Sequence, residues 1–156
     1  MSAYRIALLG AQDRSAFVSG SDALDRYLRE QAKQDMRRRV ASCFVAVDSE
    51  GGIAGYYTIA ATSLILDTLS AEHIKRLPRY PSIPAVLLGR LAVAQAHQGK
   101  RLGGALVADA LLRATRAEVM AYAMVVDAKD GQAVRFYEHL GFERLGDDRR
   151  RLIRSL

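Results

Sequence analysis

The sequence predicts a mixed α/β (α+β) fold in one domain that spans residues 1–156. Hydrophobic residues make up 50% of the 156 residues, which is enough for one compact core. Segments with helical periodicity alternate with short β-like apolar runs along the chain. No repeat, low-complexity segment or linker separates these segments, and the three prolines cluster between residues 78 and 84 in a predicted loop.

The first third of the chain predicts a helix and a hairpin after a short apolar segment. After the apolar opening YRIALL, Ser21 is suited to cap a helix that runs to about Arg39. The runs CFVAVD and GIAGYYTIA, joined by SEGG, predict a β-hairpin, because glycine supplies the positive φ that a tight turn requires. One face of the helix carries apolar side chains at intervals of three and four residues: Leu24, Tyr27, Leu28, Ala32 and Met36.

The rest of the chain predicts three more helices and at least three strands. SAEHIKRL favours a short helix, and the nearly unbroken apolar run AVLLGRLAV favours a buried central strand. A helix is expected from Leu102, a strand in AMVVDA, and a helix in GQAVRFYEHLGF that is closed by Gly141. The C-terminal DDRRRLIRSL alternates charged and apolar residues, which fits a last edge strand or a contact between two copies of the chain.

The net charge and the cysteine count indicate which kind of partner and which cellular compartment to expect. A net charge of +6 favours a polyanion, a phosphorylated cofactor or an acidic partner, although charge sets attraction and not specificity. The single cysteine, Cys43, excludes an internal disulfide and a thiolate metal cluster, so no metal site is predicted. We expect Cys43 to be a small buried hydrophobe in a strand. Without a signal sequence or an apolar run of membrane-spanning length, a soluble cytoplasmic protein is expected.

The run HQGKRLGGALV, residues 97–107, lies between the predicted central strand and the next helix. Unpaired backbone N–H groups and the positive end of the helix dipole meet at such a junction, which can therefore bind an anion. The spacing satisfies neither the Walker pattern nor the dinucleotide fingerprint. A glycine-rich turn with solvated basic side chains fits the local sequence equally well. The small and basic residues of the junction are Gly99, Lys100, Arg101, Gly103 and Gly104.

Two longer runs, LLGRLAVAQAHQGKRLGGALVADAL and VDAKDGQAVRFYEHLGF, resemble the GNAT acetyltransferase superfamily. The resemblance implies a GNAT fold, whose sheet splays at the cofactor site, and acetyl-CoA as the cofactor. It implies that backbone amides from Gln98 to Gly104 hold the pyrophosphate and that Leu91–Val93 binds the pantetheine arm. Arg101 stands where the family has its middle glycine, and we expect a helical conformation there that does not demand glycine. The implied cofactor-binding residues are Leu91, Ala92, Val93, Gln98, Gly99, Lys100, Arg101, Leu102, Gly103, Gly104, Asp130, Ala133 and Phe136.

The resemblance extends to the GNAT toxins of bacterial toxin–antitoxin pairs. It rests on four runs in order, SGSDALDRYLREQAKQDMRRRVASCFVAVD, AGYYTIA, LPRYPSIPAVLLGRLAV and VDAKD, which span nearly the whole chain. This resemblance implies an enzyme that acetylates the free α-amino group of aminoacyl-tRNA and so blocks translation. It also implies a ribbon-helix-helix antitoxin and a complex that binds operator DNA. We expect two copies of the chain to associate as a homodimer.

Tyr137 is the candidate catalytic acid, because it matches the family tyrosine whose hydroxyl lies near the acetyl sulfur. A phenol with a pKa of about 10 is protonated at neutral pH and can donate to the departing thiolate. The alternative is a tyrosine packed at the edge of the core. Asp130 has two interpretations, a seat for the coenzyme or the N-cap of the next helix. No general base is predicted, because the polar candidates fall on predicted helix surfaces: Glu72, His73, Glu138 and His139.

Basic side chains form a second candidate site. They are concentrated on the predicted first helix and could track the phosphates of a nucleic acid. The alternative is a solvated helix face with ion pairs four residues apart, such as Asp25 with Arg29. The candidate nucleic-acid-binding residues are Arg29, Lys33, Arg37, Arg38, Arg39, Arg76, Arg79 and Arg90.

Three functions follow from these residues and their resemblance. The first is a toxin that acetylates charged tRNA. The second is a GNAT enzyme that acetylates a small amine, a polyamine or a protein amine through the same cofactor site. The third is a non-enzymatic interaction module or corepressor that acts with an antitoxin.

Overall fold

The structure is a computed structural model that describes residues 3–65, 71–75, 77, 80–146 and 148–156. The chain forms two compact units. Unit 1 comprises Met1–Ala60 and Gly89–Ala110, and unit 2 comprises Ala61–Leu88 and Leu111–Leu156. Within the described residues, no helix is both long enough and apolar enough to cross a membrane.

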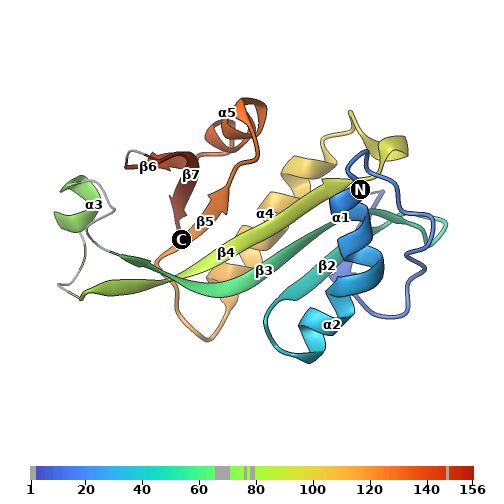
Figure 1. The fold of residues 1–156 in the computed structure, drawn as a ribbon, viewed down its shortest axis with the longest axis horizontal. Helices are drawn as coiled ribbons and strands as arrows, with labels where there is room; N and C mark the ends of the chain where they lie inside the picture. Colours follow the sequence, from blue (N-terminus) through green and yellow to red (C-terminus); the bar gives the residue numbers. More distant parts are fainter. Residues whose placement is uncertain (1–2, 66–70, 76, 78–79, 147) are drawn as a thin grey trace. The chain divides into compact units, whose positions relative to one another are not determined.

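Helices and strands follow one another along the chain, and Figure 1 labels most of them. Among the described residues the strands are β1 Arg5–Leu8, β2 Ser42–Val47, β3 Ile53–Ile65, β4 Ser82–Val93, β5 Ala123–Asp127, β6 Glu143–Leu145 and β7 Asp148–Ser155. The helices are α1 Asp22–Arg26, the π-helical η1 Tyr27–Gln31, α2 Ala32–Arg37, α3 Ala71–Lys75, the 3-10 helix η3 Gln95–His97, α4 Leu102–Arg116 and α5 Gly131–His139. β3, β4 and α4 contribute residues to both units.

The strands belong to a seven-stranded sheet in the order β1-β2-β3-β4-β5-β7-β6. Pairing is antiparallel for β1–β2, β2–β3, β5–β7 and β6–β7, and parallel for β4–β5. The β4–β5 ladder runs from Ala85–Ala123 to Leu88–Val126, and β4 itself continues to Val93. A mixed, mostly antiparallel sheet with helices confirms the predicted fold class.

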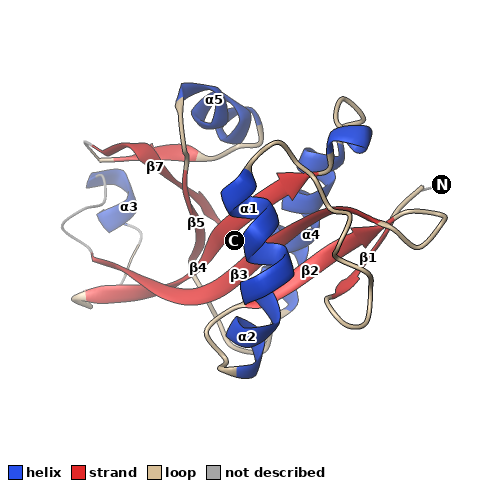
Figure 2. Ribbon diagram, turned by 45° about the vertical axis from the view of Figure 1, so that its right-hand side comes forward, coloured by secondary structure: helices blue, strands red, loops and turns tan. Residues whose placement is uncertain are grey.

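In unit 1, the predicted first helix is present as α1, η1 and α2 in succession (Figure 2). Ser21 caps it, because its hydroxyl accepts from the Leu24 amide at 3.3 Å. The middle section is π-helical, and the Ala32 amide donates to the Tyr27 carbonyl five residues earlier. The spacing of apolar residues in the sequence does not predict this wider helical turn. The predicted apolar face is confirmed, since its five side chains pack into one core cluster with Val45, Tyr56 and Ala92.

The predicted hairpin is also confirmed. β2 and β3 pair antiparallel, and Gly51 in the connecting turn has a φ of +87°. Cys43 is 1% exposed, and burial raises the pKa of its thiol to about 12, so it is the buried hydrophobe that was expected. Gly55 allows α4 to approach the sheet, because a Cβ there would lie 3.0 Å from both the Ala92 carbonyl oxygen and Leu106 Cδ1.

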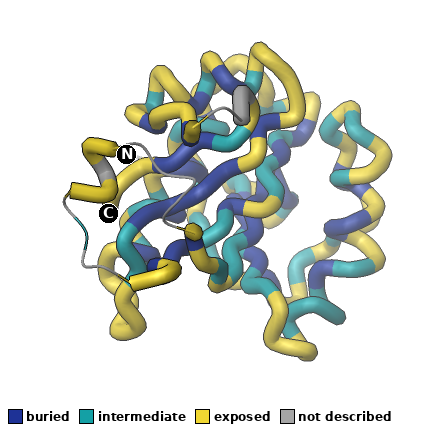
Figure 3. Tube along the Cα trace, turned by 60° about the vertical axis from the view of Figure 1, so that its left-hand side comes forward, coloured by how far each residue is buried: buried dark blue, intermediate teal, exposed yellow. Residues whose placement is uncertain are grey.

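In unit 2, β5 is flanked by β4 and β7, and its first four residues are buried. Figure 3 colours the Cα trace by the burial of each residue. The core of this unit joins residues of β3, β4, β5, β6 and β7. The helices predicted in this region are present as α3 and α5. Gly141, with a φ of +92°, follows the end of α5 as predicted.

Of the two interpretations of the C-terminal segment, an edge strand or a contact between two copies, the edge strand is wrong. β7 lies between β5 and β6, so the edge belongs to β6. Leu152 and Ile153 are adjacent and 0% and 1% exposed, which means that both faces of β7 are covered. The charged and apolar alternation predicts a strand, but it does not specify which strands pair with it.

Candidate functional site

The predicted junction between a strand and a helix is present in unit 1. β4 ends at Val93, η3 follows, and α4 begins at Leu102. The first helical hydrogen bond joins the Ala105 amide to the Arg101 carbonyl at 3.3 Å. The amides of Leu102, Gly103 and Gly104 therefore precede the hydrogen-bond ladder of α4, where an anion can accept from them.

The backbone of the turn before α4 is left-handed at two residues. Gly99 has a φ of +80° and Arg101 a φ of +62°. The expected helical conformation at Arg101 is therefore wrong. Arginine adopts here the conformation that glycine adopts freely, at a cost of about 1 kcal/mol. The side chains of Lys100 and Arg101 are exposed at the rim of the junction.

Gln98 braces this turn through its side chain. Its Nε2 donates to the Val93 carbonyl at 3.0 Å and to the Ser19 carbonyl at 2.8 Å. Both N–H groups of the side-chain amide are thereby used. The backbone amide of Gln98 donates to the Gln95 carbonyl at 3.3 Å, so Gln98 supports the turn instead of offering a free donor to an anion. The backbone amide of Gln95 adds a bond to the Val18 carbonyl at 2.8 Å.

Residues 17–19, which we call the strap, link the first helix to this turn. Asp25 is 4% exposed and accepts from the Ser19 amide at 3.0 Å and the Ser19 hydroxyl at 2.6 Å. Arg29 Nη1 donates to the Phe17 carbonyl at 2.9 Å. Asp25 and Arg29 thus hold the strap instead of forming the ion pair expected for a solvated helix face. The sequence offered no signal for these contacts, which join segments without a shared periodicity.

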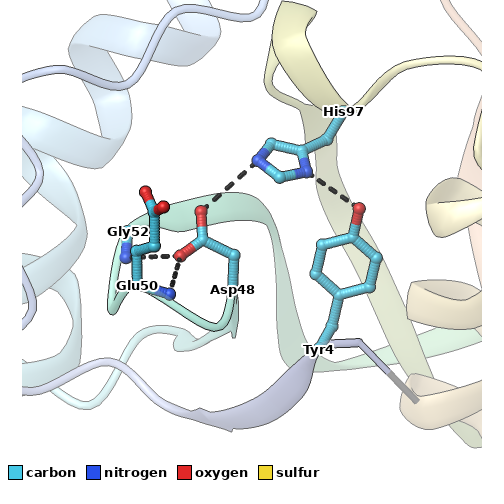
Figure 4. A network of polar contacts seen from close by, with 5 residues as sticks. All are labelled: Tyr4, Asp48, Glu50, Gly52 and His97. Carbon is cyan, nitrogen blue, oxygen red and sulfur yellow. Dashed lines mark hydrogen bonds and ion pairs between the residues drawn. The ribbon is translucent and has the colours of Figure 1, made fainter. Parts of the chain in front are cut away.

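His97 supports the junction from another direction (Figure 4). Its Nε2 lies 3.4 Å from Asp48 Oδ2, and its Nδ1 lies 2.8 Å from the Tyr4 hydroxyl. The backbone amides of Gly52 and Glu50 hold the pKa of Asp48 below its usual range, so the carboxylate is charged and only accepts. A neutral His97 therefore carries its proton on Nε2 and accepts from Tyr4 at Nδ1.

The second group of predicted residues lies on and before α5, in unit 2. Asp130 Oδ1 accepts from the Ala133 amide at 2.8 Å, which confirms the N-cap interpretation of Asp130. Ala133 and Phe136 are half-buried. The ring of Tyr137 is 8% exposed and packs edge to face against Phe136 at 5.1 Å and Phe142 at 5.5 Å.

Burial raises the pKa of Tyr137 to about 12, so its phenol is neutral at pH 7. The hydroxyl makes no hydrogen bond with any residue that the structure describes. Among the described residues, every side-chain oxygen or nitrogen that is fully buried has a hydrogen-bond partner. Because the Tyr137 hydroxyl has none, it is not fully buried and reaches the surface of its unit. The packed ring fits a tyrosine at the core edge, and the accessible hydroxyl leaves its proton available for donation.

The predicted basic residues fall into separate environments. Three of them, Arg37, Arg38 and Arg39, are exposed at the end of α2. Arg29 is exposed but bonded to the strap, and Lys33 is half-buried. Arg76 and Arg79 lie outside the described residues.

Arg90 is turned inward. Its guanidinium carbon lies 3.6 Å from the centre of the Tyr27 ring. The Tyr27 hydroxyl donates to Asp35 Oδ2 at 2.7 Å, and Gln31 Nε2 donates to Asp35 Oδ1 at 3.0 Å. These two bonds hold the pKa of Asp35 below its usual range. Arg90 is therefore part of the packing of the π-helical section.

Of the side chains considered as a general base, Glu138 pairs with Arg144 at 3.3 Å on the surface, and Glu72 and His139 are exposed. The side chain of His73 lies outside the described residues. The two predicted groups, at the junction and on α5, belong to different units.

Comparison with known proteins identifies a family for this chain. The profile described as "Acetyltransferase (GNAT) domain" matches residues 39–144. A curated relative from Mycobacterium tuberculosis (strain ATCC 25618 / H37Rv), named tRNA-acetylating toxin, is 33% identical over 135 residues. The match covers 85% of this chain and 80% of the relative.

The solved structures that resemble this chain include toxins as well. AtaT complexed with acetyl-methionyl-tRNAfMet matches with a TM-score of 0.88 and 28% identity, over 97% of this chain and 94% of that chain. A tyrosine-to-phenylalanine mutant of the AtaT toxin, bound to the C-terminus of the antitoxin AtaR, matches with a TM-score of 0.80 and 25% identity. That match covers 99% of this chain and 94% of that one.

We predict that Gln98→Ala weakens coenzyme A binding by roughly five- to tenfold, because two hydrogen bonds that fix the turn are lost. Calorimetry measures the affinity. Gln95→Ala is the matched control, since that side chain makes no hydrogen bond with the described residues, and it should bind like wild type. Equal affinity of Gln98→Ala and wild type would show that the brace does not shape the coenzyme site.

We also predict that Tyr137 stays protonated far above neutral pH. A raised pKa means that folding favours the neutral phenol, so at pH 11 about a tenth of Tyr137 should be ionised, against about nine tenths for an unperturbed tyrosine. The difference in phenolate absorbance between wild type and Tyr137→Phe isolates this residue. A midpoint at pH 10 or below would contradict the burial seen here.

Proposed function

The chain belongs to the GNAT acetyltransferase family, and from this we propose that it is an acetyl-CoA-dependent N-acetyltransferase acting as a toxin. Its substrate would be the α-amino group of aminoacyl-tRNA, and its effect a block of translation. The observation that carries the proposal is the relative named tRNA-acetylating toxin, which shares 33% identity across 85% of this chain. The structural match to AtaT with acetyl-methionyl-tRNAfMet supports the same substrate class.

The junction is suited to the coenzyme. When bound, acetyl-CoA supplies an activated acetyl group as a thioester. We propose that the amides of Leu102, Gly103 and Gly104 donate to its pyrophosphate, because these groups precede the ladder of α4 and lie at the positive end of the helix. Lys100 and Arg101 would add charge at the rim. Gly99 and Gln98 would shape the turn.

The end of β4 would bind the pantetheine arm. The β4–β5 ladder stops at Leu88, and the strand continues through the predicted residues Leu91, Ala92 and Val93. The backbone of an extended segment beyond its ladder can bond to an amide-bearing ligand, as a strand bonds to its neighbour. Ala133 and Phe136 are further proposed contacts, and Asp130 would act indirectly, through its cap of α5.

We assign Tyr137 the role of the acid. The substrate nitrogen bonds to the acetyl carbon while the carbon–sulfur bond breaks, and the Tyr137 hydroxyl gives its proton to the departing sulfur. The nitrogen releases a proton to water, and Tyr137 regains one from solvent. The α-amine of an aminoacyl ester is less basic than a lysine amine, so part of it is neutral near pH 7 without a protein base. This agrees with the exposed positions of Glu72 and His139.

The exposed basic residues would bind the phosphates of tRNA. Arg37, Arg38 and Arg39 project from the end of α2, near Lys33 and Arg29 in sequence. Such contacts give affinity without identifying bases. Arg90 would act indirectly, by fixing Tyr27.

Partners and assembly follow the family. AtaT, which this chain resembles, has been solved with the C-terminus of its antitoxin AtaR, and this supports an antitoxin for this chain. A ribbon-helix-helix antitoxin follows from the family resemblance. Operator DNA is proposed because the AtaT–AtaR complex has been solved bound to DNA. We also propose a homodimer, and the composition favours a cytoplasmic location. The family match to residues 39–144 draws on both units, which supports one catalytic domain over the chain.

A translation assay with purified components tests this function. We expect wild type to inhibit translation only when acetyl-CoA is present, and Tyr137→Phe to lower the rate of acetylation of charged tRNA by at least about 100-fold. Coenzyme affinity should be unchanged in that variant. Tyr80→Phe, which alters an exposed tyrosine with no assigned role, is the matched control and should act like wild type.

Two outcomes would contradict the proposal. Unaffected translation together with turnover of a small amine would identify an ordinary GNAT enzyme. Tight coenzyme binding without acetyl transfer to any charged tRNA would identify an interaction module.

A further inference from the structure

Unit 1 has a hollow that the proposed coenzyme site does not use. It is lined by residues 11–15, which follow β1, and by Arg29 and Lys33 on the first helix, and its volume is about 370 Å³. Arg29 and Lys33 are four residues apart, so they share one face of the helix. The volume lies in the range of sites for small ligands. We call this feature the basic hollow.

The charges in the basic hollow are unequal. Arg14, Arg29 and Lys33 carry positive charge, and among the described residues that line the hollow Asp13 is the one acidic residue. Asp13 is turned to its own loop, where Oδ1 accepts from the Ser15 amide at 2.9 Å and the Ser15 hydroxyl at 2.7 Å. The hollow therefore presents an excess of positive charge to a ligand.

Two of these cations are held in place before any ligand binds. Arg14 Nη1 donates to the Leu28 carbonyl at 3.1 Å and to the Arg29 carbonyl at 3.0 Å. Arg29 Nη1 donates to the Phe17 carbonyl at 2.9 Å. Each guanidinium is fixed at one nitrogen, and its other N–H groups make no hydrogen bond with the described residues. Fixed guanidinium groups lose little entropy when they bind, and their planar geometry matches phosphate oxygens.

Lys33 differs from the two arginines. It makes no hydrogen bond or ion pair with any residue that the structure describes, so removing its charge breaks no internal contact. The rim of the hollow is open, because Ala11, Asp13 and Ser15 are exposed. An open rim admits a segment of a polymer, and not only a small anion.

We propose that the basic hollow binds a backbone phosphate of the tRNA substrate, with Arg14 as a contact that the basic pattern of the helix did not include. This inference rests on the function proposed above. Arg29 also holds the strap that receives Gln98, so RNA bound here would sit on the same unit as the junction. Arg37, Arg38 and Arg39 are exposed and show no comparable anchoring, and we expect each to contribute less.

The test compares Lys33→Gln and Arg14→Gln with wild type for binding of uncharged tRNA across a series of salt concentrations. We expect each variant to weaken binding by about five- to tenfold at low salt and to reduce the slope of log affinity against log salt by about 0.7 to 0.9. Coenzyme A affinity should not change. Lys75→Gln removes an exposed charge in α3 that is not among the residues lining the hollow, and it should alter neither quantity.

Arg14→Gln also removes two hydrogen bonds to backbone carbonyls, so the stability of this variant is measured in parallel. If Arg14→Gln does not fold, the binding data for Lys33→Gln decide the test. An unchanged salt slope in Lys33→Gln would overturn the proposal. A loss of affinity for coenzyme A, but not for dephospho-coenzyme A, would also overturn it, because the hollow would then hold a phosphate of the coenzyme. Binding of uncharged tRNA tests only the basic hollow, because no acetyl group is transferred. Acetylation of charged tRNA by the wild-type protein tests the proposed function.

Discussion

The unpaired amides at the start of α4 are the feature on which the rest of the site depends. A helix cannot bond its own first N–H groups, and here the ladder begins only with the amide of Ala105. The preceding turn is left-handed at Gly99 and Arg101, which brings the chain from β4 into α4 within a few residues. Any anion that binds at this junction gains from several donors and from the dipole of a 15-residue helix.

The turn needs external support, because left-handed arginine is strained and few bonds lie within the turn itself. Gln98 ties it to the end of β4 and to the strap, and the strap is tied to the first helix by Asp25 and Arg29. His97 adds the connection to the β2–β3 turn and to Tyr4. The proposed RNA-binding helix and the proposed coenzyme turn are thus parts of one hydrogen-bonded system within unit 1.

Local features of this fold could be predicted from the sequence, whereas long-range contacts could not. The cap at Ser21, the apolar face of the first helix and the start of α4 each depend on neighbouring residues, and all are confirmed. The bond from Gln98 to Ser19 spans 79 residues, and the position of β7 inside the sheet depends on strand pairing. The sequence does not predict the left-handed φ of Arg101, because Arg101 belongs to the turn before α4 and not to the helix itself.

The central claim is that the amides at the start of α4 bind the coenzyme diphosphate. The most direct measurement is a titration of the isotope-labelled protein with coenzyme A, followed by NMR of the backbone amides. The account predicts large, saturable shifts at Leu102, Gly103 and Gly104 with the same midpoint that calorimetry gives for binding. Coenzyme binding that leaves these three amides unmoved would contradict it.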